Sequence, residues 1–148
     1  MTQLGVVGGG TMGAGIAEIA IRAGDDVLVL ERDQAAADAA RARIEKSINR
    51  AVSKSKISAD DAEQALARLS LTTSVSDFAD RELVIEALPE IEALKVGFFA
   101  ELDKVTDAFI LEFQGGKGQA INKPGHEEVA AAHEEDVNQE KIVKGRRS

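Results

Sequence analysis

The chain has 148 residues, with 18 Lys and Arg against 26 Asp and Glu, and it has no cysteine. This length predicts one compact domain, and the net charge of −8 argues against a nucleic-acid-binding protein, which would gather Lys and Arg on one face. The lack of cysteine excludes disulfides and thiolate chemistry, and with no long apolar run or charged leader the sequence predicts a cytoplasmic protein without a membrane segment.

Short apolar runs alternate with amphipathic segments through the first three-quarters of the chain. The expected strands lie, in chain order, at residues 4–7, 27–30, 71–74, 83–85 and 109–111. The expected helices run from Gly13 to Arg22, after the N-caps Asp33 and Ser58, and across residues 94–105. Because parallel strands need long crossovers that cover the sheet, this order predicts an α/β fold with a doubly wound parallel sheet of Rossmann type.

The composition changes after residue 111. Residues 112–148 contain six large apolar side chains, together with a glycine-rich stretch, an acidic stretch and a basic end. So few apolar residues can hardly form a core. We therefore expect a domain over residues 1–111 and a divergent polar tail over 112–148, flexible or marginally helical.

A glycine loop stands between the first expected strand and the first expected helix. It reads Gly8-Gly9-Gly10-Thr11-Met12-Gly13 and matches G-x-G-x-x-G in the order strand, loop, helix. The first glycine permits a tight turn, the second lets a pyrophosphate approach the backbone, and the third lets helix and strand pack closely. Because helix N-termini favour anions, Gly8, Gly10, Thr11, Met12 and Gly13 are predicted to bind the pyrophosphate of a dinucleotide.

An acidic residue, Glu31, follows the second expected strand. A carboxylate at this point of the fold accepts hydrogen bonds from the adenosine ribose hydroxyls and repels a 2′-phosphate. The cofactor is therefore expected to be NAD rather than NADP. The neighbouring Arg32 is included in the predicted site because an arginine there can serve a phosphate.

Several motifs in a fixed order resemble the NAD-binding half of bacterial 3-hydroxyacyl-CoA dehydrogenases, especially the 3-hydroxybutyryl-CoA type. They are the glycine loop extended to Ala17, Val29-Leu30-Glu31-Arg32-Asp33, Ala42-Arg43-Ile44-Glu45-Lys46-Ser47, Val84-Ile85-Glu86-Ala87, Glu92-Ala93-Leu94-Lys95-Val96 and Phe99-Ala100-Glu101-Leu102-Asp103. The resemblance extends from residue 3 to about residue 111.

The resemblance also implies further site residues. It gives Glu31 the adenosine ribose and places Ala87, Glu90 and Lys95 beside the nicotinamide. Ser47 and Lys54, on the helix after the second strand, would lie against the coenzyme A part of an acyl-CoA substrate.

The family motifs that would follow Leu111 do not appear in the sequence. In the family, a Ser-Asn-Thr-Ser-Ser loop and a His-Phe-Phe-Asn-Pro segment with the catalytic histidine precede a helical domain that holds the dimer contacts. We therefore expect no catalytic residue, no such helical domain and no family dimer contacts in this chain. His126 and His133 lack the spacing and the third ligand of a metal site, so no metal is expected either.

Three interpretations remain open. The leading one is an NAD(H)-binding domain of a dehydrogenase that oxidises (S)-3-hydroxyacyl-CoA, not competent for catalysis by itself. A second is a non-catalytic NAD-binding or interaction module. A third is a truncated, frameshifted or fused product.

Overall fold

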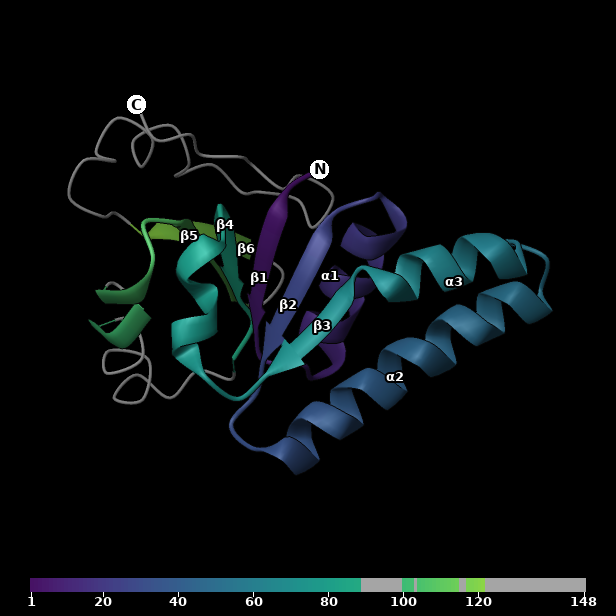
Figure 1. The fold of residues 1–148 in the computed structure, drawn as a ribbon, viewed down its shortest axis with the longest axis horizontal. Coiled ribbons are helices and arrows are strands. Elements are labelled where there is room, and N and C mark those ends of the chain that lie inside the picture. The colour runs from purple at the N-terminus through teal and green to yellow at the C-terminus, as the bar shows by residue number, and fades with distance from the viewer. Residues whose placement is uncertain (89–99, 103, 115–116, 122–148) are drawn as a thin grey trace.

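A computed structural model describes residues 1–88, 100–102, 104–114 and 117–121, and its centre is one six-stranded sheet (Figure 1). The strands are β1 (Gln3–Val7), β2 (Asp26–Leu30), β3 (Leu69–Thr72), β4 (Leu83–Glu86), β5 (Phe109–Gln114) and β6 (Lys117–Ile121). The helices are α1 (Thr11–Arg22), α2 (Gln34–Ser53), α3 (Ala59–Ala67) and the 3-10 helix η1 (Val75–Asp80). Residues 100–102 and 104–105 are also helical.

The strand order in the sheet is β3-β2-β1-β4-β5-β6. The first five strands of this order are parallel, and β6 pairs antiparallel with β5. The chain winds outward from β1 to β3 and then returns to β4 on the other side of β1. This is the doubly wound Rossmann arrangement, and it confirms the fold class expected from the sequence.

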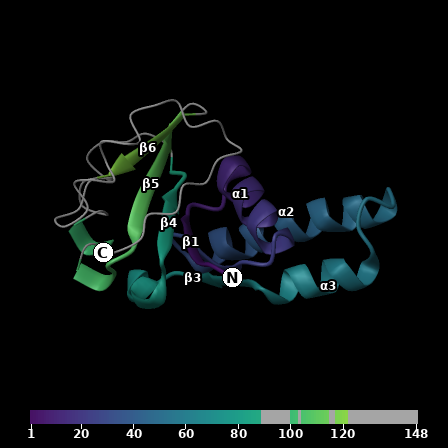
Figure 2. The ribbon, with the colours of Figure 1, turned by 90° about the horizontal axis from the view of Figure 1, so that it is seen from above.

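Alternate side chains of each central strand face opposite sides of the sheet, and both sides are buried. Leu4 and Val6 of β1 belong to the larger core cluster, under α1, α2 and α3, which Figures 1 and 2 show together on one side. Val7 belongs to the second cluster with Phe78 of η1 and Leu102. Burial on both faces explains why these strands are continuous apolar runs.

Two helices begin at the capping residues that the sequence predicts. The Asp33 carboxylate accepts a hydrogen bond of 2.8 Å from the backbone N–H of Ala36, at the start of α2. The Ser58 hydroxyl oxygen accepts one of 3.0 Å from the N–H of Asp61, at the start of α3. These local bonds satisfy donors that a helix N-terminus otherwise leaves unpaired.

The sheet continues past residue 111, where the domain boundary was expected. β5 runs on to Gln114, and Lys117–Ile121 pairs with it as β6. These residues therefore belong to the sheet rather than to a flexible or helical tail. Counting large apolar residues misses such an edge strand, because backbone hydrogen bonds suffice to pair it. The rest of the expected tail, residues 122–148, and residues 94–99 of the expected fourth helix lie outside the described residues.

An arginine joins the amino-terminal ends of the central strands. The side chain of Arg81 is 6% exposed and donates hydrogen bonds of 2.8 Å to both Asp26 and Asp80. It also donates to the side chain of Gln3 and to the carbonyl of Leu4. The planar guanidinium thus connects β1, β2 and the end of η1 at the amino-terminal ends of the strands, and the glycine loop lies at the opposite, carboxyl ends.

Candidate functional site

The glycine loop lies at the carboxyl end of β1, between β2 and β4. Gly8 has a φ of +91°, and its N–H donates a 2.9 Å hydrogen bond to the carbonyl of Leu30 in β2. A Cβ on Gly13 would lie 1.7 Å from the carbonyl oxygen of Gly8. The loop therefore needs glycine at both positions, at the first for the left-handed conformation and at the second for the close approach of α1 to the turn.

The N-terminus of α1 carries no side-chain cap. Its N-cap residue is Gly10, and its first turn contains no acidic residue. Apart from its chain neighbours, no atom of the described residues lies within 4 Å of the place that a Cβ on Gly10 would take. The starts of α2 and α3 are both capped by side chains. The start of α1 has no such cap, and uncapped N–H groups at a helix N-terminus are able to bind an anion.

The two residues between the second and third glycines have different environments. Thr11 is exposed at the start of α1. The side chain of Met12 is partly buried against the larger core cluster. Met12 is therefore a packing side chain, and only its backbone N–H lies at the helix end that faces the loop.

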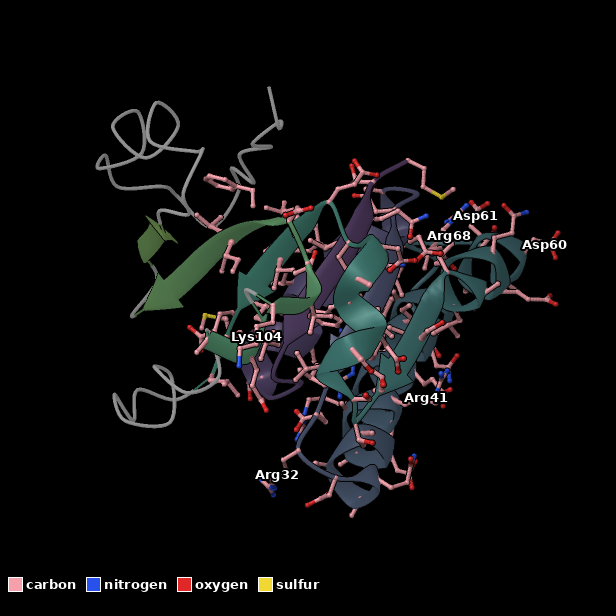
Figure 3. All side chains as sticks on the ribbon, turned by 60° about the vertical axis from the view of Figure 1, so that its left-hand side comes forward. Arg32, Arg41, Asp60, Asp61, Arg68 and Lys104 are labelled. Carbon is pink, nitrogen blue, oxygen red and sulfur yellow. The ribbon has the colours of Figure 1, made fainter. Side chains whose placement is uncertain are left out.

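Glu31 directly follows β2 and reaches back to the loop. Its carboxylate accepts a hydrogen bond from the N–H of Gly9, and its own N–H donates 2.9 Å to the carbonyl of Thr72. The structure therefore brings the predicted ribose acid and the predicted pyrophosphate loop together. Arg32, in contrast, has an 83% exposed side chain that lies 3.4 Å from Asp33, and Figure 3 shows it at the outer surface.

The exit from β4 forms the other side of the loop. The N–H of Ala87 donates 2.9 Å to the carbonyl of Val7, and the Ala87 carbonyl oxygen lies 3.3 Å from where a Cβ on Gly8 would be. The buried carboxylate of Glu86 accepts a 2.6 Å hydrogen bond from the N–H of Leu88. Ala87 thus lies at the crevice between β1 and β4, while Glu90 and Lys95 lie outside the described residues.

The two residues predicted to contact coenzyme A lie on α2 and at its C-terminal end. Ser47 is exposed, and its hydroxyl donates 2.7 Å to the Glu18 carboxylate of α1. Lys54 is the exposed C-cap residue of the helix. Seven residues separate them, which is about 10 Å along a helix axis, so the structure does not bring them into contact.

Sequence analysis assigns no role to Arg43, although this residue contacts the loop. Its Nη1 atom donates a 2.5 Å hydrogen bond to the carbonyl oxygen of Gly9. Gly9 and Arg43 stand in two of the motifs that carry the family resemblance, but they are 34 residues apart in the chain, and nothing in either motif indicates this contact.

In the part of the chain that the structure describes, no helix is long and apolar enough to cross a bilayer. The same residues contain no group of three or more His, Asp or Glu side chains placed to hold a metal ion. His126 and His133 lie outside the described ranges.

A family model and several curated relatives indicate one family for residues 3–112. Residues 3–112 match the family model for the 3-hydroxyacyl-CoA dehydrogenase NAD binding domain. A 3-hydroxybutyryl-CoA dehydrogenase of Mycobacterium tuberculosis is 50% identical over 103 residues, which are 70% of this chain and 36% of that protein. A probable 3-hydroxybutyryl-CoA dehydrogenase of Deinococcus radiodurans is 39% identical over 103 residues, 70% of this chain and 37% of that protein.

Solved structures agree with this result. The crystal structure of M. tuberculosis FadB2 superposes with a TM-score of 0.75 at 36% identity and covers 90% of this chain and 58% of that one. The chain spans little more than a third, 36%, of the curated M. tuberculosis relative. A shorter match of another kind also exists: 64 residues, 43% of this chain, are 44% identical to the ATP synthase subunit alpha of Clavibacter sepedonicus, over 12% of that protein.

Proposed function

The chain belongs to the 3-hydroxyacyl-CoA dehydrogenase family as an NAD-binding domain, and we propose that it binds NAD(H) with the pyrophosphate on the glycine loop and the adenosine ribose on Glu31. One observation carries this proposal: the uncapped start of α1 at Gly10 and the Glu31 carboxylate both lie next to Gly9.

Each part of the loop has a task in this proposal. The backbone N–H groups of Thr11, Met12 and Gly13 face the pyrophosphate at the positive end of the helix dipole. Gly10 leaves room for the phosphate to approach the backbone. Glu31 accepts hydrogen bonds from the ribose 2′- and 3′-hydroxyls and disfavours a 2′-phosphate. Arg32, which pairs with Asp33, is available at the rim of the adenosine end.

The nicotinamide end is proposed to lie at the exit from β4. Ala87 borders the crevice between β1 and β4, which is where doubly wound sheets bind their ligands. By the family resemblance, Glu90 and Lys95 continue this wall. When bound, NAD supplies a hydride acceptor at this end.

For the complete enzyme, the proposed reaction is the oxidation of an (S)-3-hydroxyacyl-CoA to the 3-ketoacyl-CoA in the cytoplasm. NAD, when bound, would supply the acceptor for the hydride from C3 of the substrate, and the hydroxyl proton would pass to an acid–base group. Ser47 and Lys54 of α2 are proposed to contact the coenzyme A part, with the lysine charge on its phosphates. No residue of this chain is assigned to the proton transfer, so we propose that the chain alone binds NAD without turnover.

A composite origin is the alternative that a specific observation favours. The 64-residue match to an ATP synthase subunit alpha is of a kind that a fused product would give. Sequencing the source DNA beyond codon 111 tests this. A downstream frame encoding Ser-Asn-Thr-Ser-Ser and His-Phe-Phe-Asn-Pro would support a frameshift, and its absence would support a fusion or a separate module.

Replacing Glu31 by alanine is expected to weaken NADH binding by roughly 10- to 150-fold, because hydrogen bonds to a charged acceptor contribute about 1.5–3 kcal/mol. The measurement is NADH fluorescence, which suits a chain with no Trp and no Tyr. Wild-type protein should also bind NADH more tightly than NADPH.

Glu45→Ala is the matched control, since it also removes one carboxylate. The Glu45 side chain, on α2, is about half exposed, and its ion pair with Arg41 is long, at 3.8 Å. NADH affinity should stay within about two-fold of wild type in this variant. Equal wild-type affinities for NADH and NADPH would contradict the role given to Glu31.

A further inference from the structure

Gly9, at the centre of the glycine loop, is held from two directions. Its N–H donates to the Glu31 carboxylate, and its carbonyl oxygen accepts the 2.5 Å hydrogen bond from Arg43. A Cβ on Gly9 would lie 2.4 Å from the Cβ of Ala40, so the loop also lies tightly against α2. Ala40 and Arg43 are three residues apart and share a face of that helix.

The helix that carries Arg43 is itself well anchored. Asp33 caps its N-terminus, its buried residues include Ala40 and Ile44, and Ser47 hydrogen-bonds to Glu18 of α1. Arg43 lies one turn before Ser47. The hydrogen bond from Arg43 therefore fixes the position of the glycine loop relative to a helix, which is more rigid than another loop would be.

We propose that Arg43 is a positioning residue for the dinucleotide site and holds the Gly9–Gly10 peptide in the binding geometry through the Gly9 carbonyl oxygen. This inference rests on the proposed function. Glu31 holds only the N–H of Gly9, because a carboxylate accepts hydrogen bonds and cannot donate one to the Gly9 carbonyl oxygen. A loop with three successive glycines has much conformational freedom to lose, and holding it in advance lowers the entropic cost of binding.

The role predicts a particular pattern of nucleotide affinities. A residue that only positions the loop affects every nucleotide whose pyrophosphate binds there, by the same factor. A residue that instead contacted a 2′-phosphate would affect NADPH alone. Arg43→Ala is therefore expected to weaken NADH and NADPH alike by about 5- to 20-fold, and Arg43→Lys should recover part of the loss because its ammonium can still donate.

The control is Arg41→Ala, which removes the same charge two residues earlier on α2. Arg41 pairs with Glu45 at 3.8 Å across one helical turn, and Figure 3 shows it on the surface of that helix. Its loss should change neither nucleotide affinity by more than about two-fold. Unchanged NADH binding in Arg43→Ala, or a loss confined to NADPH, would overturn the inference.

Amide hydrogen exchange of the nucleotide-free protein supplies a second readout. The Gly9 amide, which is hydrogen-bonded to Glu31, should exchange several-fold faster in Arg43→Ala than in wild type or Arg41→Ala, while the amides of β1 and β2 keep their protection. Unchanged exchange in the loop would overturn the positioning role whatever the nucleotide results. Wild-type protein that failed to bind NADH, with the exchange difference present, would overturn the proposed function and leave the loop contact supported.

Discussion

Gly13→Ala is expected to destabilise the protein by about 2–4 kcal/mol and to reduce NADH affinity by more than roughly 100-fold. The added methyl group would lie 1.7 Å from the carbonyl oxygen of Gly8. That oxygen belongs to backbone, so the clash is relieved only when α1 moves away from the turn. The movement takes the helix N-terminus away from the pyrophosphate. Urea unfolding followed by circular dichroism, together with NADH titration, measures both effects.

Gly15→Ala is the matched control in the same helix. Among the residues that the structure describes, no atom outside the helix lies within 4 Å of the Cβ that it would add. Because alanine has a higher helix propensity than glycine, this variant should be as stable as wild type or more stable, by up to about 1 kcal/mol. If Gly13→Ala behaved like Gly15→Ala, the close approach of α1 to Gly8 would not be the reason that residue 13 is a glycine.

Arg81→Met is expected to lower the free energy of unfolding by about 2–4 kcal/mol at neutral pH. Methionine keeps the apolar length of the side chain but removes its hydrogen bonds to Asp26, Asp80, Gln3 and the Leu4 carbonyl. The measurement is urea unfolding followed by circular dichroism. Arg32→Met is the control. Arg32 also pairs with an adjacent aspartate, Asp33, but its side chain is 83% exposed, so the substitution should lower the free energy of unfolding by no more than about 0.5 kcal/mol.

The stability difference between wild type and Arg81→Met should depend on pH. The hydrogen bonds from Arg81 lower the pKa of the Asp80 carboxyl from its usual value. A carboxyl whose pKa is lower in the folded state stabilises the protein above its unfolded pKa, about 3.9, and loses this effect as pH falls through the folded value. The difference between the two proteins should therefore shrink as the pH falls from about 4 toward 2. A difference that stayed constant over that range would show that the Asp80 charge contributes nothing.

Local patterns in the sequence were sufficient for most of the fold. The apolar runs of β1, β2 and β4 are buried on both faces. Asp33 caps the N-terminus of α2, and Ser58 caps that of α3. Burial and capping depend on residues within a few positions of each other, so they leave a periodic signal. The glycine loop and Glu31 were identified for the same reason, each being placed directly after a recognisable strand.

The sequence by itself thus determined the strand and helix order, the glycine loop and the acid that follows β2. Only the tertiary structure decided that β6 pairs antiparallel with β5, that Arg81 joins β1 to β2, and that Arg43 holds the carbonyl of Gly9. Each of these depends on backbone pairing or on a contact between residues far apart along the chain. A long polar side chain can reach many partners, and its sequence neighbours carry no sign of which one the fold brings within hydrogen-bonding distance.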